Sequence, residues 1–478
     1  MGVADFLYQK IVDSFEFEPT PGQLELFRRL AEFATSREEE DLLVINGYAG
    51  TGKTSAIAAF VKTLSSFEMK FKLMAPTGRA AKVLAGYTGQ KSATIHKTIY
   101  RQRSMQDGVG QFSLNINKAS DTIFIVDEVS LIAGQTVGSP FGTGNLLSDL
   151  MTFVRNGQNN RLILMGDGAQ LPPISLQRSP ALDPEYLQAA YGCVDWVHLS
   201  DVVRQTATSG ILYNATLIRQ MIQAAEDNGW VERPQLETRQ FTDFSRIQGG
   251  DLIEKLSETL DRYGLDETVV LCRSNKRANR YNAGIRSSVL YREEQLNRGD
   301  KLMVVKNCYQ FLENVQDLDF IANGDVAELL RIRNYEERYG LHFADALLRF
   351  TDYNDVEIQA KIILDTLTSE SASLTAEQQR ILYEGVYADY AHLKTKRKIL
   401  KQVREDLYYN ALQVKYAAAI TCHKSQGGQW KAVFVDNPFW QEELSLEDLK
   451  WLYTAVTRGV EQVYLVNFSD DFFKEKTE

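Results

Sequence analysis

The stretch Gly47-Tyr48-Ala49-Gly50-Thr51-Gly52-Lys53-Thr54 fits the phosphate-binding loop pattern G-x-x-x-x-G-K-[ST] without departure. An apolar, partly β-branched run, Leu42 to Ile45, precedes it and predicts a buried strand. Residues 55–64 follow it and are rich in Ala, Ile, Val and Lys, which predicts a helix. The order strand, glycine loop, helix is the context that this motif requires. We therefore interpret the stretch as a phosphate site rather than as a plain strand–helix turn.

The residue types of this loop indicate its chemistry. Glycines allow consecutive backbone N–H groups to turn inward and cradle a polyphosphate, and the following helix N-terminus adds a favourable dipole. Lys53 would reach the β- and γ-phosphates, and the Thr54 hydroxyl would ligate Mg²⁺. The expected nucleotide contacts within the loop are Gly47, Gly50, Thr51, Gly52, Lys53 and Thr54.

Composition restricts the class of protein. The chain has 478 residues, 44% of them hydrophobic and 24% charged, which is typical of soluble globular proteins with roughly three domains. No apolar run approaches the ~20 residues of a membrane span, and residues 1–6 lack a signal-peptide layout, so we expect a cytoplasmic protein without membrane contact. Four widely spaced cysteines argue against a zinc site or an iron–sulfur cluster. A net charge of -10 means that any nucleic acid must bind in a local channel where Lys and Arg converge.

Further polar residues follow predicted strands near the phosphate loop. The apolar run Thr122 to Val126 ends in Asp127 and Glu128. Asp127 would hold Mg²⁺ directly or through water, and Glu128 would act as general base on the attacking water. The alternative is a strand end with two solvated acids. Gln170 follows another strand and could contact the γ-phosphate or the water, because ligands bind at the carboxyl edge of parallel sheets.

Gln23 has two interpretations. It lies in Thr20-Pro21-Gly22-Gln23, where Thr20 is a good helix N-cap and Gln23 completes a capping box. The functional alternative is that its amide recognises the adenine edge. The local sequence alone favours the cap.

Strands alternate with helices throughout residues 40–200, which predicts an α/β fold with a parallel sheet. Strands predicted near residues 268–272, 417–421, 431–435 and 463–466 form a second α/β unit without a phosphate loop of its own. Asp107-Gly108 within residues 101–118 predicts an inserted β-hairpin, with a long surface loop as the alternative.

A second insertion spans residues 297–412. Short strands in its first part predict a small barrel or SH3-like module, and residues 374–407 are charged and helical. A basic cluster in this helical part is either a solvated face or a DNA contact; its members are Lys394, Lys396, Arg397, Lys398 and Lys401.

Together these motifs make an ordered set, and the chain resembles superfamily 1 helicases, in particular the Dda- and RecD-like group that moves 5′ to 3′. The similarity extends from Gln23 to Arg458. Residues 75–81 resemble motif Ia, 166–173 motif III, 203–205 motif IV, 423–427 motif V and 453–458 motif VI. The inserted hairpin resembles the family's separation pin, although it is short, and the 297–412 insertion resembles its SH3-like accessory domain.

This resemblance implies roles for individual residues. ATP would bind between two RecA-like P-loop domains, with Gln23 now favoured as the adenine-reading residue and with Arg204 and Arg458 reaching the γ-phosphate from the second domain. Residues resembling single-strand contacts are Thr77, Thr94, His96, His423, Lys424 and Ser425. His96, considered alone, is as readily structural. Phe112 is the candidate for stacking on a duplex junction, and packing of the hairpin is its alternative.

The expected domains are a first RecA-like domain at 1–200 carrying the hairpin at 101–118, a second at 201–296 and 413–478, and the accessory domain at 297–412. The expected function is that of a monomeric, ATP- and Mg²⁺-dependent DNA helicase acting on single strands and duplex junctions. Two rivals stay open. One is a translocase that displaces proteins with little unwinding, and the other is a DNA-binding scaffold with a relic ATPase fold.

Overall fold

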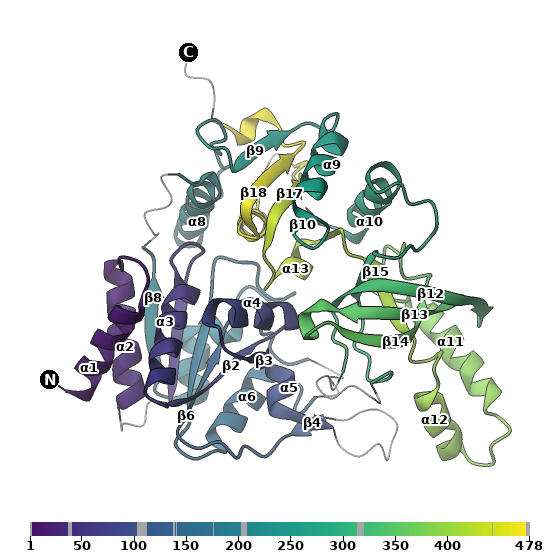
Figure 1. Cartoon of the computed structure of the whole chain (residues 1–478), viewed down its shortest axis with the longest axis horizontal. Helices are drawn as coiled ribbons and strands as arrows, with labels where there is room; N and C mark the ends of the chain where they lie inside the picture. The colour runs from purple at the N-terminus through teal and green to yellow at the C-terminus, as the bar shows by residue number, and fades with distance from the viewer. Residues whose placement is uncertain are drawn as a thin grey trace.

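The computed structural model describes residues 2–36, 41–102, 112–136, 139, 141–174, 176–201, 208–312, 320–441 and 443–474. Two parallel sheets and a closed barrel organise them (Figure 1). The first sheet has the order β3-β2-β6-β7-β1-β8, and all its pairings are parallel. Its strands are β1 (Leu42–Gly47), β2 (Lys70–Ala75), β3 (Ser92–Thr94), β6 (Thr122–Val126), β7 (Arg161–Gly166) and β8 (Asp195–Leu199).

Helices cover both faces of this sheet because alternate strand residues point to opposite sides. Leu43 and Ile45 of β1 pack with four helices, α1 (Val3–Ser14), α2 (Pro21–Thr35), α3 (Lys53–Ser66) and α4 (Gly78–Thr88). Leu42 and Val44 pack on the other side with α5 (Ile95–Ile99), α6 (Leu146–Arg155) and α7 (Pro184–Tyr191). The sheet is therefore buried on both faces, as parallel sheets generally are.

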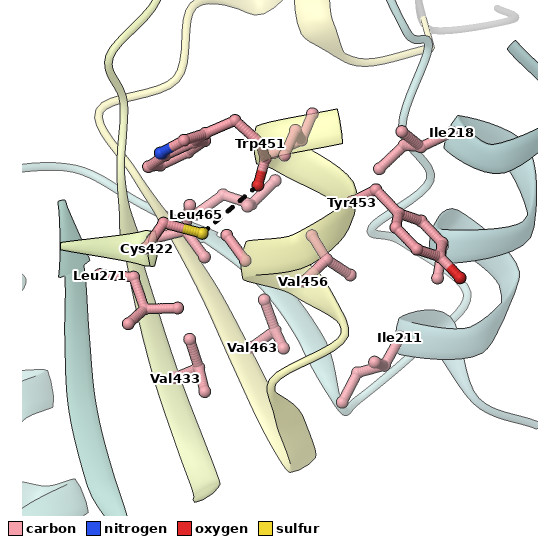
Figure 2. Close-up of a cluster of buried hydrophobic side chains, with 14 of the residues drawn as sticks. Ile211, Ile218, Leu271, Cys422, Val433, Trp451, Tyr453, Val456, Val463 and Leu465 are labelled. Atoms are coloured by element: carbon pink, nitrogen blue, oxygen red, sulfur yellow. Dashed lines mark hydrogen bonds between the residues drawn. The ribbon is translucent and has the colours of Figure 1, made fainter. Parts of the chain in front are cut away.

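The second sheet has the order β16-β10-β17-β18-β9 and is also parallel. Its strands are β9 (Phe244–Ile247), β10 (Thr268–Cys272), β16 (Ala419–Thr421), β17 (Trp430–Asp436) and β18 (Gly459–Val466). One face packs against α8 (Gly210–Asn228) and α14 (Leu446–Val456), and the other against α9 (Leu252–Tyr263) and α10 (Asn275–Gly284). Figure 2 shows Trp451 and Val456 of α14 over the sheet, whereas the Tyr453 ring turns toward α8.

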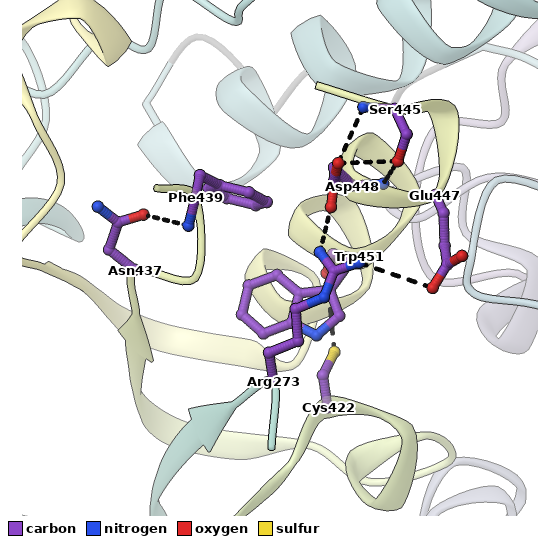
Figure 3. Close-up of polar contacts among 8 residues, drawn as sticks. All are labelled: Arg273, Cys422, Asn437, Phe439, Ser445, Glu447, Asp448 and Trp451. Atoms are coloured by element: carbon purple, nitrogen blue, oxygen red, sulfur yellow. Dashed lines mark hydrogen bonds and ion pairs between the residues drawn. The ribbon is translucent and has the colours of Figure 1, made fainter. Parts of the chain in front are cut away.

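A polar cluster fixes α14 on this sheet (Figure 3). Ser445 caps the helix and shares a capping box with Asp448, which also pairs with Arg273 at the end of β10. Burial alone would raise the pKa of Asp448, but hydrogen bonds from Ser445 and Arg273 outweigh it and hold that pKa below its usual range. Cys422 Sγ lies 3.7 Å from the Trp451 carbonyl oxygen. The cluster anchors the start of the helix whose second half carries Tyr453 and Thr454 and which Arg458 follows.

The barrel closes through five strands in the order β11-β12-β13-β14-β15. They are β11 (Lys301–Val304), β12 (Val326–Arg338), β13 (Leu341–Phe350), β14 (Val356–Ile363) and β15 (Leu412–Tyr416). All pairings are antiparallel except that of β14 with β15, which is parallel. Two helices, α11 (Ala376–Asp389) and α12 (Lys396–Glu405), occupy the connection between β14 and β15.

Much of the predicted secondary structure is confirmed. The parallel α/β sheets, the small barrel and the helical nature of residues 374–407 agree with the sequence analysis. The hairpin is present as β4 (Tyr100–Gln102) paired antiparallel with β5 (Phe112–Leu114), and residues 103–111 between them lie outside the described residues. Within the described ranges, no helix combines the length and the apolar character needed to cross a membrane.

Candidate functional site

The glycine loop leads from β1 directly into α3. Gly50 and Gly52 have φ values of +78° and +75°, a backbone region that L-residues with a Cβ rarely adopt. A Cβ on Gly47 would lie 2.8 Å from Lys53 Cδ, so a side chain there would displace the lysine. Lys53 is the first residue of α3, and its Nζ donates to the carbonyl oxygens of Tyr48, at 2.9 Å, and Gly47. The lysine therefore lies across the loop, where a phosphate could replace these carbonyls.

The two carboxylates after β6 are held differently. Asp127 is buried and its Oδ1 accepts from the Glu128 N–H at 2.7 Å. Burial, and after it the charge of Glu128, raises the pKa of Asp127. Glu128 has φ +56° and ψ +38°, a left-handed conformation that is uncommon for a residue other than glycine. Its Oε2 is buried without a hydrogen-bond partner among the described residues.

Gln170 and Asp167 follow β7. Gln170 is buried, and its Oε1 has no hydrogen-bond partner in the described part of the chain. Asp167 Oδ2 accepts from the Tyr453 hydroxyl at 2.7 Å, and that hydroxyl accepts from the Ala49 N–H of the glycine loop at 2.8 Å. One hydroxyl from the second α/β unit thus bridges the phosphate loop and the end of β7.

Gln23 forms the predicted capping box. Its Oε1 accepts from the Thr20 N–H at 3.0 Å, and Thr20 Oγ1 accepts from the Gln23 N–H at 3.3 Å. Its Nε2 donates to the Thr51 carbonyl oxygen in the glycine loop at 2.9 Å. Both ends of the amide are therefore engaged, but each keeps one further hydrogen-bonding position, and recognition of adenine by this amide stays a prediction.

Arg458 enters from the second unit. It is only 3% exposed, and its acceptors within the described part of the chain are neutral oxygens: the Thr454 and Gly428 carbonyls and the Thr457 hydroxyl. A cavity of about 650 Å³ brings it together with the first unit. Site residues lining this cavity are Gln23, Gly50, Gly52, Lys53, Thr54, Asp127, Glu128, Gln170 and Arg458. Arg204 lies outside the described residues.

These residues fit a magnesium–nucleotide. The glycine loop has the N–H groups and the lysine that a polyphosphate requires. The unsatisfied oxygens of Glu128 and Gln170 are acceptors that a bound water would satisfy. The Thr54 hydroxyl and the Asp127 carboxylate are oxygen ligands of the kind Mg²⁺ prefers.

Most of the residues predicted to contact single-stranded DNA line two adjoining grooves beneath the barrel. Thr77, His423 and Lys424 line one of about 170 Å³, and Thr94 and His96 line a second of about 120 Å³. Asn323, in the turn before β12, lines both grooves and accepts from Lys424 Nζ. Burial lowers the pKa of Lys424.

Several side chains predicted to contact single-stranded DNA already have partners within the protein. Thr77 and Thr94 cap α4 and α5 through their hydroxyls. Ser425 is fully buried and donates to the Cys422 carbonyl oxygen at 2.7 Å, so any contact of this side chain with a strand requires rearrangement. Burial lowers the pKa of His96 to about 4, and its ring packs 4.7 Å from that of Phe141, so the side chain is neutral at physiological pH.

Phe112 packs the hairpin against the protein, which is the alternative to stacking on a duplex junction. The side chain is 5% exposed and its ring lies 4.7 Å from Phe141 and 5.1 Å from Tyr309. Phe320 completes the contact from the barrel side at 6.0 Å. Because stacking on a terminal base pair needs an exposed ring, Phe112 is not available as the wedge that the sequence suggested, and it packs the hairpin stem instead.

The sequence analysis gave no role to three residues that the structure places at the junction of the units. They are Tyr453, whose hydroxyl reaches Ala49; Thr454, whose Oγ1 accepts from the Leu171 N–H at 2.8 Å; and Gln426, whose Nε2 donates to the Leu171 carbonyl oxygen at 2.6 Å. All three lie in the stretches that resemble motifs V and VI, but their partners are 255 or more residues away, so no local signal could reveal the contacts themselves.

Comparison with known proteins gives matches in both α/β units. Residues 19–235 match the AAA domain family, and residues 416–466 match the UvrD-like helicase C-terminal domain. The ATP-dependent RecD2 DNA helicase of Deinococcus radiodurans is 29% identical over 175 residues, which are 36% of this chain and 21% of that protein. The matched part thus spans about a fifth of that relative.

Two further similarities extend over most of the chain. The uncharacterized protein R530 of Acanthamoeba polyphaga mimivirus is 23% identical over 501 residues, covering 91% of this chain and 97% of that protein. Among solved structures, that of two coordinating Pif1 helicases unwinding forked double-stranded DNA covers 96% of this chain and 95% of its own, with 16% identity and a TM-score of 0.47.

Proposed function

We propose that this chain, a member of the RecD-like superfamily 1 helicases, is an ATP-dependent DNA helicase that moves 5′ to 3′ on single-stranded DNA and unwinds duplexes. The observation that carries the proposal is one cavity lined by the glycine loop, two carboxylates and Arg458 from the opposite unit. Because both α/β units line this cavity, binding or release of a nucleotide would change the distance between them.

Each side chain then has a role. Lys53 and the loop N–H groups bind the phosphates, and Thr54 and Asp127 hold Mg²⁺, which neutralises charge on the phosphates when bound. Glu128 takes a proton from the attacking water, and Gln170 orients that water. Arg458, with Arg204 as its proposed partner, stabilises the charge that spreads over the transferred phosphoryl group.

The proposal includes a division into domains. We assign residues 1–200 and the pair 201–296 and 417–478 to two RecA-like domains, and residues 297–416 to an SH3-like accessory domain. The boundary expected at residue 412 moves to 416 because β15 (Leu412–Tyr416) is a strand of the closed barrel. A single strand would lie in the grooves beneath the barrel, contacting both RecA-like domains, so that closure on ATP moves one set of contacts relative to the other. We also propose that the working unit is a monomer.

Strand displacement on duplexes with 5′ or 3′ single-stranded tails tests the proposal, beside ATPase rates with and without an oligonucleotide. We expect stimulation of ATPase by single strands and unwinding of the 5′-tailed duplex only. Unwinding from the 3′ tail would contradict the direction. Stimulated ATPase without unwinding would identify a translocase, and absence of ATPase would identify a scaffold.

A further inference from the structure

The connection between β14 and β15 carries a concentration of positive charge. Residues 390–405 contain six Lys and Arg and one acid, Glu405, in a chain whose net charge is -10. Five of the six side chains are exposed and form what we call the α12 basic face: Lys394, Lys396, Arg397, Lys398 and Lys401.

Intramolecular contacts do not account for this face. Within the described residues only Lys401 has an acidic partner, Glu405, at 3.9 Å. The nearby Asp389 is engaged by Arg338 at 2.7 Å, and Asp406 by the Tyr390 hydroxyl at 3.0 Å. Three of the cations occupy the first turn of α12, which has no acid, and positive charge is unfavourable at that end of the helix dipole. The three charges of the first turn therefore do not stabilise the helix that carries them.

The face is nevertheless held in a defined position. Ile399 and Val403 on the opposite side of α12 are buried in a hydrophobic cluster with Leu382 and Val386 of α11 and Phe343 of the barrel. The helix end is tied down because Asn410 Nδ2 donates to the Arg404 carbonyl oxygen at 2.7 Å. A fixed array of cations is typical of a surface that binds a polyanion.

The C-terminal end of α12, opposite the turn that carries Lys396, Arg397 and Lys398, is linked to the hairpin. Cys308 Sγ contacts the Asn410 carbonyl oxygen at 3.5 Å, and the next residue, Tyr309, has its ring 5.1 Å from that of Phe112 in β5. Figure 1 shows α12 and β4 on the same side of the molecule. If the hairpin acts as the separation pin that it resembles, this is the side at which the duplex meets it.

We propose that the α12 basic face binds the phosphate backbone of duplex DNA ahead of the junction. This inference rests on the proposed helicase function. Duplex is favoured over single strand because single-strand sites combine cations with aromatic rings that stack on bases. The face itself contains no aromatic residue, and contacts with phosphate alone suit a duplex whose bases are paired.

The test replaces all five residues with glutamine and measures binding of a blunt duplex, a 5′-tailed duplex and a single-stranded oligothymidylate over a range of salt concentrations. A charge-retaining variant carries Lys394→Arg, Lys396→Arg, Lys398→Arg and Lys401→Arg. A matched control neutralises five exposed cations on other elements: Lys10, Arg28, Lys62, Arg262 and Lys474.

We expect the glutamine variant to bind both duplexes about tenfold more weakly at low salt, with a salt slope reduced by about 1 for each phosphate that the face no longer neutralises. Single-strand affinity and single-strand-stimulated ATPase should equal those of the wild type, as should all properties of the arginine variant. Duplex affinity equal to wild type, or an equally weakened matched control, would overturn the inference, and so would a parallel decrease in single-strand binding. If the wild type shows no single-strand-stimulated ATPase, the proposed function fails instead.

Discussion

At the scale of the residue, the candidate site is distinguished by polar atoms without partners and by strained backbone. Glu128 combines a left-handed conformation with an unpaired buried oxygen, and Gln170 has a second unpaired oxygen in the same cavity. Such features reduce stability and persist where the surrounding structure enforces them, often at functional sites. The strained backbone and the unpaired oxygens support a catalytic role for the residues that follow β6. The sequence suggested this role only through the position of two acids after an apolar strand.

Lys53→Ala and Glu128→Gln should fail in different ways. Removing the lysine removes a phosphate contact, so we expect weak nucleotide binding and no turnover. Glu128→Gln keeps the shape of the site but removes the base, so ATP should bind while kcat falls by about 10²–10⁴-fold. Fluorescent-nucleotide titration and steady-state ATPase measure both properties. Loss of ATP binding in Glu128→Gln would contradict the assignment of the base.

Tyr453→Phe should weaken the link between the phosphate loop and the second unit. The change leaves the Ala49 N–H and Asp167 Oδ2 without the hydroxyl that now joins them. Each unpaired buried group costs about 1–3 kcal/mol, so we expect roughly tenfold lower kcat/KM for ATP with single-strand binding unchanged in the absence of nucleotide. Tyr464→Phe, in β18 of the second sheet, is the matched control. Equal kinetics for both variants would show that the bridge has no functional role.

At the scale of the element, the sequence predicted strands well where apolar runs were unbroken and poorly elsewhere. The predicted run Thr122 to Val126 is β6 without any change in its bounds. β15 was missed because Gln413 and Lys415 break the continuous apolar run, although their alternation with Leu412, Val414 and Tyr416 has the period of a strand and both are buried by the barrel. The role of Phe112 could not be settled either, because its neighbours Tyr309 and Phe320 come from a distant segment.

The turn before β12 should make stability depend on pH. Burial raises the pKa of Asp325 to about 7, although hydrogen bonds from the Ala322 N–H and the Tyr353 hydroxyl lower it. The folded protein therefore keeps a proton that the unfolded chain releases near pH 4, and stability falls as pH rises from about 4 to 7, by up to about 1.4 kcal/mol per unit. Above pH 7 this loss is complete.

Asp325→Asn should remove this contribution, because an amide does not ionise; its oxygen can still accept from the Ala322 N–H while its NH₂ donates to the Tyr353 hydroxyl oxygen. We expect a smaller fall in Tm between pH 5 and pH 8 than in the wild type, measured by thermal unfolding. Asp355→Asn, an exposed acid in the turn before β14, is the control and should follow the wild type. If Asp325→Asn loses as much Tm as the wild type across this range, Asp325 does not titrate as described.

At the scale of the whole molecule, the proposed function depends on contacts between units that are far apart in sequence. Motif spacing predicted most of the residues that line the candidate site, but the contacts that join the units were not visible in the sequence. Arg79 illustrates this: its guanidinium stacks 3.9 Å from the Trp430 ring and donates to the Gln429 carbonyl oxygen, joining α4 to the second sheet. The same two units enclose the cavity that contains Lys53 and Arg458.

Arg458 is the residue through which closure of the two units should act on catalysis. Its guanidinium is now bonded to neutral oxygens of its own unit, so it has donors that a phosphate could attract when the units close. Arg458→Ala should reduce kcat on the order of 10³-fold, while single-strand affinity without nucleotide stays near that of the wild type. Arg458→Lys keeps the charge but lacks the planar fork, and it should recover only part of the rate. Thermal unfolding of both variants separates this effect from the structural cost of removing the hydrogen bond to Gly428. A folded Arg458→Ala protein with near-normal ATPase would remove this arginine from the site, and hydrolysis would then not require the second unit to complete it.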